Sequence, residues 1–363
     1  MNRYFFYPIL LVLGIIAIDK LVCIPDVRES GRRSYKAGQN VFLGLPYVWK
    51  EDIQIQKQNK SIAMVVGTSR SDIFHQWETI PFSKSTFPKE IYFETRTAVK
   101  ASEFLTFYIM IKSMTESGFR PDVIFLEFSE EMLNEFNSFS YKTKWQELTF
   151  HESELLDFYP MIVGKTKRDL IAKLLFLSYN YHISPIQTIS NLITGKRVQN
   201  DDYFIQLTAS LNKKRPYSKD DIGFEDGKIP EDIYKDRIEG YTNGQIEILL
   251  RNFTLSETEV NFFAKTLELS ETYNIPLVIW EPQIHPYFQS KRKEITGGKL
   301  FRTYTQKFVS PESKNIRTVS LNEGNTNCKT YTDSSHVSPI CVPEIAEKLI
   351  ETAKTIPNFK INK

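Results

Sequence analysis

The sequence predicts an α/β protein, a three-layer α/β/α sandwich whose central sheet is mainly parallel. Short uninterrupted apolar runs recur along the chain, as expected of strands that are buried on both faces. Segments with apolar residues every three or four positions separate these runs, and such spacing is typical of helices with one buried face. Strands that alternate with helices in this way form parallel sheets covered by helices.

The first predicted element is a membrane helix at the N-terminus, over residues 1–24. Charge interrupts the apolar span Tyr4–Ile24 only at Asp19 and Lys20, and the span is close to the ~20 residues that cross a bilayer. No small-x-small cleavage pattern follows, which favours an uncleaved signal anchor. Residues 25–60, polar and interrupted by glycine and proline, are predicted to form a tether.

The charges around this helix leave its orientation open. Arg3 is the only cation before the apolar segment, whereas four cations follow it, Arg28, Arg32, Arg33 and Lys36. The positive-inside rule alone would place the bulk of the protein in the cytoplasm. A short N-terminal signal favours export instead, and we expect an extracytoplasmic protein.

The next elements form a strand–helix–strand unit. The apolar run 61–66 predicts the first strand of the sheet, and 91–93 predicts the second. Residues 101–118 have helical periodicity and end at a glycine, and Pro121 introduces a strand over 123–128. The helix is long enough for a right-handed crossover between parallel strands.

The C-terminal part continues the pattern. Ser256 and a glutamate three residues later form a capping box before a helix over 257–273. Two strands and a closing helix are predicted to follow, at 276–280, 316–321 and 343–355. The closing helix begins with a proline, which fits a first-turn position. Together these elements predict one α/β domain over 61–355.

The middle of the chain, about 137–250, interrupts this alternation. Residues 169–177 and 186–193 have helical spacing, and 200–241 are polar with few apolar runs. The pattern predicts a helical insertion followed by a long loop. The insertion would form a lid or wall over the site, offer a partner surface, or make no contact with the site.

Three residues carry the predicted chemistry. Ser69 follows the first strand on a turn that Gly67 permits, and Asp333 and His336 lie three positions apart near the C-terminus. A serine hydroxyl is a weak nucleophile unless a base within about 3 Å takes its proton and another group orients that base. We expect His336 to be the base and Asp333 to orient it.

The predicted strands bring these residues to one place. Ser69, Ser129, Glu281 and Asp333 each follow a predicted strand. In open parallel sheets, sites lie at the carboxyl ends of the strands. The four residues are therefore expected at one edge of the sheet, where exposed backbone N–H groups can bind a developing oxyanion.

In two motifs the chain resembles the SGNH (GDSL-like) hydrolase superfamily. Gly67-Thr68-Ser69 is similar to the block after the first strand, and Asp333-Ser334-Ser335-His336 is similar to the block before the last helix. The resemblance covers roughly residues 60–135 and 255–355. The apolar N-terminus and the large insertion look most like the membrane-anchored envelope branch, which includes DltD-like and AlgJ/AlgX-like proteins and families of unknown function.

This resemblance implies a flavodoxin-like sandwich and a triad of Ser69, His336 and Asp333. It implies a serine esterase or an O-acyltransferase that acts on cell-envelope carbohydrate and needs no cofactor. The N-terminal helix would hold the protein on the membrane, with the catalytic domain periplasmic or otherwise extracytoplasmic. A membrane acyltransferase is a further partner that the resemblance suggests.

Two blocks of the superfamily are missing here. In place of an oxyanion-hole glycine and a Gly-x-Asn-Asp stretch, the chain reads Glu94-Thr95-Arg96-Thr97-Ala98 and Glu127-Phe128-Ser129-Glu130-Glu131. The oxyanion hole would then come from the Ser69 turn, together with Thr97 or Ser129, or it would be absent. The alternative hypothesis is a catalytically inactive SGNH-like envelope module that binds glycan or a partner protein.

Five further residues each have two interpretations. Arg70 would bind an anionic group or a carbonyl oxygen, or it would form a structural salt bridge. Trp280 would stack on a sugar or pack in the core, and His285 would touch substrate or pack within a proline-rich loop. Cys328 and Cys341 would form a disulfide in an oxidising compartment, or remain two thiols.

Composition argues against several classes of function. The 363 residues include 46 Lys and Arg against 44 Asp and Glu, a net charge of +2, and no basic stripe carries interleaved aromatics, so nucleic-acid binding is not expected. The five histidines show no His-x-x-x-His or His-Glu-x-x-His spacing, so no metal site is predicted. Gly164-Lys165-Thr166 is similar to the end of a P-loop, but Tyr159 stands where its first glycine belongs.

Overall fold

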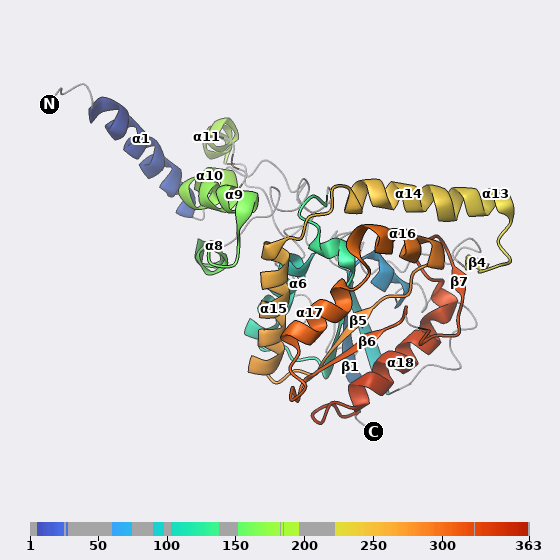
Figure 1. The fold of residues 1–363 in the computed structure, drawn as a ribbon. Coiled ribbons are helices and arrows are strands. Elements are labelled where there is room, and N and C mark those ends of the chain that lie inside the picture. Colours follow the sequence, from blue (N-terminus) through green and yellow to red (C-terminus); the bar gives the residue numbers. More distant parts are fainter. Residues whose placement is uncertain are drawn as a thin grey trace. The chain divides into compact units, whose positions relative to one another are not determined.

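The computed structural model describes residues 6–24, 27, 60–74, 90–97, 103–137, 152–181, 183, 185–195, 222–322 and 324–361 (Figure 1). The chain forms two compact units. We call them the helical unit, Met1–Phe42 with Thr143–Asn212, and the sheet unit, Leu43–Lys142 with Lys213–Lys363. Nearly all of the predicted tether, 25–60, lies outside the described residues, as does the polar stretch 200–221.

The sheet unit is built on five parallel strands in the order β2-β1-β3-β5-β6. The strands are β1 (Ser61–Gly67), β2 (Ile91–Thr97), β3 (Val123–Glu127), β5 (Leu277–Glu281) and β6 (Ile316–Ser320). The chain enters at β1, steps outward to β2 and then crosses back to β3, so the winding direction reverses between β1 and β3. Such a reversal opens a crevice at the carboxyl ends of the two strands. The predicted α/β architecture with a mainly parallel sheet is confirmed.

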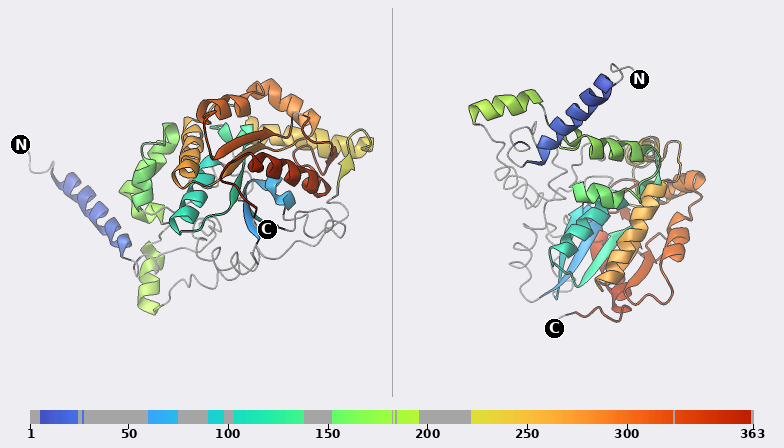
Figure 2. Two further views of the ribbon diagram at one scale, coloured as in Figure 1. Left: turned by 90° about the horizontal axis from the view of Figure 1, so that it is seen from below. Right: turned by 90° about the vertical axis from the view of Figure 1, so that its left-hand side faces the viewer.

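Helices cover both faces of this sheet (Figures 1 and 2). Alternate strand residues face opposite sides. On one face Ala63 and Val65 of β1 belong to a buried cluster with Ile345 and Leu349 of helix α18 (Val342–Lys354). The other face carries α6 (Phe104–Glu116) and α15 (Glu257–Thr272), which meet through aromatic side chains: the ring of Phe104 packs at a tilt against the rings of Phe128 and Phe263. The apolar runs form strands because both of their faces are covered.

Ser256 caps the first turn of α15 as predicted, but the reciprocal half of the capping box is replaced: the backbone N–H of Ser256 donates to the carbonyl of Leu133, and the Glu259 carboxylate accepts from the backbone N–H of Leu105. The Ser256 hydroxyl accepts a hydrogen bond from the backbone N–H of Glu259. Two helices absent from the prediction follow β5, namely α16 (Pro286–Thr296) and α17 (Leu300–Phe308). The prediction missed α16, although a proline at its first position and a glycine directly after its end are helix signals; its N-cap, a histidine, is an uncommon one.

A long loop was predicted over 200–241. For residues 231–241, which the structure describes, this prediction is wrong. Residues 231–250 form consecutive helical segments: α13 (Glu231–Ile233), the π-helix η8 (Tyr234–Gly240), α14 (Tyr241–Gln245) and the π-helix η9 (Ile246–Leu250). This stretch belongs to the sheet unit. The π turns shift the buried positions away from a 3.6-residue period, so the sequence pattern does not look helical. Exposed ion pairs such as Lys235–Glu231 also make it look like a polar loop.

The described part of the helical unit contains six helical segments. They are α1 (Phe6–Asp19), the 3-10 helix η2 (Lys20–Cys23), α8 (Glu152–Phe158), α9 (Gly164–Leu175), α10 (Leu177–Asn180) and α11 (Pro185–Thr194). The helix predicted over 169–177 breaks at Phe176 into α9 and α10. Among the residues that the structure describes, no helix combines the length and the apolar character needed to cross a membrane.

Candidate active site

Ser69 lies directly after β1, as the first residue of the 3-10 helix η3 (Ser69–Asp72). Its neighbours Arg70 and Ser71 are buried, whereas Ser69 itself is partly exposed. Gly67 allows this turn to sit close to β3, because an added Cβ would lie 2.0 Å from the Ser71 hydroxyl oxygen and 2.4 Å from a Glu127 carboxylate oxygen. The glycine is therefore required by close approach rather than by its backbone angles.

The loop after β7 (Thr330–Tyr331) brings Asp333 and His336 to this turn. The Oδ1 atom of Asp333 accepts backbone N–H bonds from Ser335 (2.7 Å) and His336 (2.9 Å), which fix the carboxylate. Both carboxylate oxygens lie 2.9 Å from His336 Nδ1. On the other side of the ring, His336 Nε2 is 2.8 Å from Ser69 Oγ. The structure thus brings the three predicted residues together.

The order of these contacts sets the direction in which a proton can move. A carboxylate can only accept a hydrogen bond, so Nδ1 of His336 donates to Asp333. Nε2 is then left with a lone pair directed at the Ser69 hydroxyl. This arrangement lets the imidazole act as a base toward the serine while the carboxylate stabilises the imidazolium that forms.

Several links hold the Asp333–His336 loop in place. The strand β7 pairs with β4 (Phe224–Glu225) in a small antiparallel sheet. Cys328 and Cys341 form a disulfide that closes the segment around the loop, with their Cα atoms 5.6 Å apart. The backbone N–H of Ser334 donates to the carbonyl of Arg237 in η8 at 3.2 Å. In a π-helix such as η8 the wider turn leaves one backbone carbonyl without a partner in the helix. Turns of this kind often occur at functional sites.

Glu127, the last residue of β3, holds the turn that carries Ser69 through hydrogen bonds. It is fully buried and accepts hydrogen bonds from the backbone N–H of Thr68 (2.8 Å), the Thr68 hydroxyl (2.6 Å), the Ser71 hydroxyl (2.7 Å) and the Ser129 hydroxyl (3.0 Å). Three of these donors belong to the turn that carries Ser69. The sequence analysis missed this role, although a carboxylate that ends a buried apolar run is a signal that can be found.

Arg70 forms the structural salt bridge that was one of its two predicted roles. Its guanidinium group is buried and pairs with Glu131 at 2.8 Å. It also donates to the Ser129 hydroxyl (2.7 Å) and to the carbonyl (3.2 Å) and hydroxyl oxygens of Ser335, the residue before His336. Arg70 therefore ties the nucleophile turn to the histidine loop. With these contacts made, neither Arg70 nor the Ser129 hydroxyl is directed at an oxyanion, which corrects that prediction for both.

The Arg70 pair belongs to a larger buried charge network. Arg292 of α16 pairs with Glu281 at 2.8 Å and lies within 4 Å of Glu130 and Glu131. Burial alone raises the pKa of Glu131, but Arg70 and Arg292 outweigh it and hold the pKa below the ordinary value. Burial likewise acts to lower the pKa of Arg292, and its carboxylate neighbours raise it overall. The network links the segment after β3 to the end of β5 and to α16.

Two other predicted site residues are buried, and a third is described only in its backbone. Trp280 is fully buried in the core cluster beneath α18, so it does not stack on a sugar. His285 is also buried; its Nδ1 accepts the backbone N–H of Tyr287 as a helix cap, and its Nε2 lies 3.3 Å from Asp226. Burial lowers its pKa, against the opposing effect of Asp226. Thr97 ends β2 opposite Gly67, and its side chain lies outside what the structure describes.

One residue near the triad was not predicted. Tyr241 of α14 places its ring edge-on to His336, with ring centroids 6.1 Å apart. Burial and, next, the charge of Asp333 raise the pKa of Tyr241 to about 12, so its hydroxyl stays protonated at neutral pH. The Ser69 turn was expected to supply an oxyanion donor, and no hydrogen bond is found for the backbone N–H of Ser69 within the described part of the chain.

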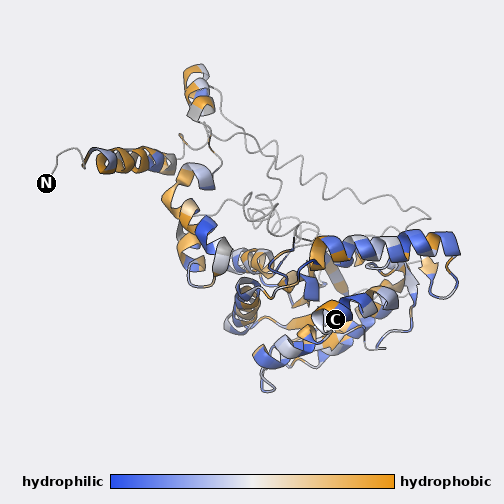
Figure 3. Cartoon of the chain, turned by 45° about the horizontal axis from the view of Figure 1, so that its top comes forward, coloured by the Kyte–Doolittle hydropathy of each residue, from blue (hydrophilic) through white to orange (hydrophobic). Residues whose placement is uncertain are grey.

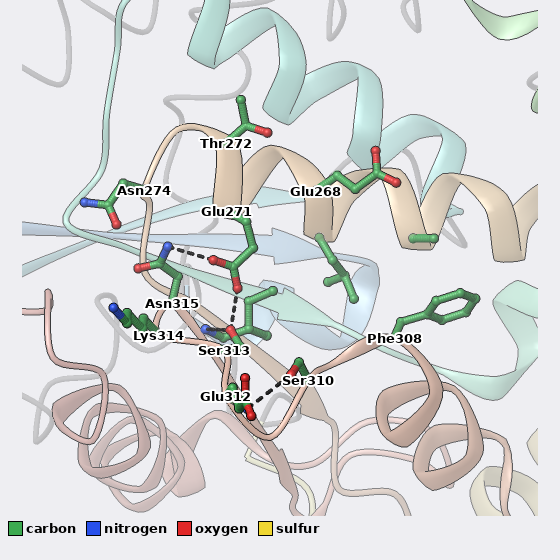
Figure 4. A pocket seen from close by; sticks show the side chains of 13 residues that line it. Glu268, Glu271, Thr272, Asn274, Phe308, Ser310, Glu312, Ser313, Lys314 and Asn315 are labelled. Atoms are coloured by element: carbon green, nitrogen blue, oxygen red, sulfur yellow. Dashed lines mark hydrogen bonds between the residues drawn. The ribbon is translucent and has the colours of Figure 1, made fainter.

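A separate pocket of about 770 Å³ lies at the opposite end of the sheet (Figure 4). The C-terminal half of α15 and the segment before β6 line it, including Glu268, Glu271 and Glu312. Asn315 donates to Glu271 at 3.0 Å, so this carboxylate is engaged within the protein. The pocket adjoins the start of β6 at Ile316. Ligands of parallel sheets bind at the other, carboxyl ends, so this pocket is not part of the candidate site.

Comparison with known proteins identifies a family but no activity. The chain has no match among curated proteins. Over residues 1–352 it matches a family described as "Protein of unknown function (DUF1574)". The match spans both the helical unit and the sheet unit. The chain therefore belongs to this family of proteins of unknown function, DUF1574.

Proposed function

We propose that this protein is a serine ester hydrolase or O-acyltransferase that uses Ser69, His336 and Asp333. The observation that carries the proposal is the unbroken chain of contacts from Ser69 Oγ through both nitrogens of His336 to Asp333, at 2.8 and 2.9 Å. These distances fall within hydrogen-bond reach of a working nucleophile and base. The position at the carboxyl ends of the strands, beside the reversal between β1 and β3, supports a ligand site there.

In the first half-reaction, Ser69 Oγ attacks the carbonyl carbon of an ester while His336 Nε2 takes the hydroxyl proton. Negative charge develops on the carbonyl oxygen, and the Ser69 amide is the donor placed to bind it. The intermediate then collapses, and the leaving alcohol receives the proton from His336. The acyl group remains on Ser69 as an ester.

The second half-reaction reverses these steps with a new nucleophile. His336 takes a proton from water or from a sugar hydroxyl, and the resulting oxygen attacks the acyl-enzyme carbonyl. Water gives a free acid, whereas a sugar hydroxyl gives an acylated sugar. In both cases Ser69 recovers its proton from His336, so the enzyme returns to its starting state.

We further propose an SGNH-like, flavodoxin-like domain held at a membrane and acting on cell-envelope carbohydrate outside the cytoplasm. The strand order supports the fold proposal, because counting only these strands gives the doubly wound order 2-1-3-4-5. The Cys328–Cys341 disulfide supports export, since such bonds persist in oxidising compartments. The exposed apolar helix α1 supports a membrane anchor, and a membrane acyltransferase would be a fitting partner.

The decisive experiment combines turnover with covalent labelling. Purified chain is incubated with a chromogenic acetyl ester and, separately, with a fluorophosphonate whose adduct is located by mass spectrometry. We expect turnover and an adduct on Ser69, both lost in Ser69→Ala. Ser310→Ala is the matched control, because this serine is exposed and remote from the triad. Equal turnover by Ser69→Ala and wild type would refute the assignment.

A non-catalytic envelope module is the second candidate. It is favoured by the internal bonding of Arg70 and Ser129, which leaves few donors for an oxyanion. On this hypothesis the crevice binds a glycan or a partner protein without turning it over. Absence of fluorophosphonate labelling, together with measurable glycan binding by a folded chain, would support it over the enzyme.

A further inference from the structure

The helix α1 exposes apolar side chains on all of its sides. Nine of its residues are large, apolar and exposed: Phe6, Tyr7, Ile9, Leu10, Leu11, Val12, Leu13, Ile15 and Ile18. A helix that packs on a protein needs only one apolar stripe. A helix that is apolar on all sides is instead expected where an apolar medium surrounds it. Figure 3 shows α1 almost entirely in the colour of apolar residues.

A second apolar surface lies on the other helices of the same unit. In α11, Ile186 and Ile193 are 82% and 80% exposed, and Ile189 lies between them at helical spacing. Leu156 of α8 and Leu175 of α9 are exposed as well. The less exposed positions of α11 are polar, Thr188 and Asn191. The helix therefore presents its apolar residues outward, the reverse of a helix that packs on its own core.

Two adjacent charges fasten α1 to these helices. The carboxylate of Asp19 accepts from the backbone N–H of Leu177 and, at 3.0 Å, of Ser178, the unpaired donors at the start of α10. The ammonium group of Lys20 donates to the carbonyls of Leu174 and Leu175 at the end of α9, each at 3.0 Å. Each charge meets the helix end that it complements. The exposed apolar residues of α1 and α9 are thus held in one rigid arrangement.

The chain continues from this joint into α11. Ile183 packs against Leu177 and Tyr181 just before α11 begins. The ten residues of α11 contain no charged side chain. Lys165, Lys167 and Arg168 stand at the beginning of α9, next to a single acidic residue. Uncharged apolar surface combined with a group of cations in the same unit is the pattern of helices that lie in an anionic bilayer interface.

We propose that a lipid bilayer covers this second surface, so that residues 152–195 form a membrane contact in addition to α1. The inference rests on the membrane anchoring in the proposed function and is independent of the serine chemistry. A lipid surface is favoured over a protein partner because the exposed apolar residues surround α1 and extend over α8, α9 and α11. A protein partner would cover one apolar face of a helix, whereas a bilayer can cover all of these exposed apolar residues. The insertion would then seat the protein on the membrane.

The test places an environment-sensitive dye at single cysteines in the full chain. In a Cys23→Ser background, cysteine replaces Leu10 in α1, Ile189 in α11 or Lys354 in α18. Each labelled protein is reconstituted into vesicles of neutral and anionic phospholipid, with and without a quencher attached to the acyl chains. The disulfide protects Cys328 and Cys341 from labelling. Thermal unfolding that matches the unlabelled chain shows that each variant is folded.

We expect the emission at positions 10 and 189 to move to shorter wavelength and to be quenched from within the lipid. The dye at position 354, an exposed lysine of the sheet unit, should show neither change. Quenching at 10 but not at 189 overturns the proposal and leaves the anchor standing. A shift at 189 without lipid quenching also overturns it, because a protein surface would then cover α11. Absence of quenching at both positions removes the anchor as well, while ester turnover reports separately on the triad.

Discussion

At the scale of single residues, a carboxylate that does not touch Ser69 holds the turn that carries this serine. Glu127 accepts four hydrogen bonds in a fully buried site, and three of their donors belong to Thr68 and Ser71 on either side of the serine. A carboxylate offers two oxygens and no donor, which matches a cluster made only of donors. We therefore expect the position of Ser69 Oγ relative to His336 to depend on the acceptor oxygens of this one side chain.

Glu127→Gln should separate positioning from chemistry. The amide replaces an acceptor oxygen with an NH2 group, so at least the Thr68 N–H or a neighbouring hydroxyl loses its partner, at a cost of about 1–3 kcal/mol in unfolding free energy. We expect kcat and the rate of fluorophosphonate labelling to fall, with little change in KM. Glu347→Gln, at an exposed position of α18, is the control. An unchanged labelling rate in a folded Glu127→Gln protein would show that the clamp is not needed.

Glu131 makes stability depend on pH in a defined direction. Despite burial, Arg70 and Arg292 hold its folded-state pKa below 4.5. A depressed pKa stabilises the folded protein fully above the unfolded value and loses that effect as pH falls through the folded value. Glu131→Gln should be less stable than wild type at neutral pH by about 3 kcal/mol, since it leaves buried guanidinium groups without their partner.

That stability difference should shrink as the pH falls below about 4.5. Urea unfolding of wild type and variant across the acid range measures it, and Glu347→Gln should show no comparable trend. A difference that stays constant on the acid side would mean that Glu131 is not the titrating group.

At the scale of elements, the loop that carries Asp333 and His336 depends on its crosslink. The disulfide joins residues separated by 13 positions, and loops of this size gain about 3 kcal/mol from closure. The double variant Cys328→Ala/Cys341→Ala should lose roughly that stability and some turnover, because the histidine loop is freed. Thiol reductant should lower the turnover of wild type and of Cys23→Ser but not of the double variant. Equal turnover with and without the bond would make the disulfide irrelevant to the site.

Some of these helices and strands could be predicted from the sequence and others could not. Apolar runs such as 61–66 predicted strands within about one residue, because both faces of these strands are buried. The π-helical segments on both sides of α14 were not predicted, because their wider turns remove the 3.6-residue period of apolar positions. Ser69, Asp333 and His336 could be proposed as neighbours from the sequence, because a serine nucleophile requires a histidine base and a carboxylate that orients it. The bonds of Glu127 to Thr68 and Ser71 join residues more than fifty positions apart, and no local pattern records them.

At the scale of the whole molecule, the division into units differs from the expected insertion of 137–250. The helices α8 to α11 group with the N-terminal helix, whereas residues 231–250 group with the sheet. The sequence could not reveal this grouping, because it depends on Asp19 and Lys20 binding backbone groups more than 150 positions away. Read locally, these two charges merely interrupt an apolar helix. In the structure they join the two chain segments of the helical unit.

If these charges hold the helical unit together, their loss should loosen that unit alone. Asp19→Ala/Lys20→Ala leaves the N–H groups of α10 and the carbonyls of α9 without their long-range partners. Hydrogen exchange followed by mass spectrometry should therefore become faster in α9 and α10, while the strands β1, β3 and β5 keep their protection and ester turnover is unchanged. Glu231→Ala/Lys235→Ala removes an exposed pair of similar composition, 2.7 Å apart in the sheet unit, and should alter neither region because such surface pairs contribute little. Faster exchange in the sheet strands of the Asp19→Ala/Lys20→Ala protein would contradict the separation into two units, since the disturbance would then pass from one to the other.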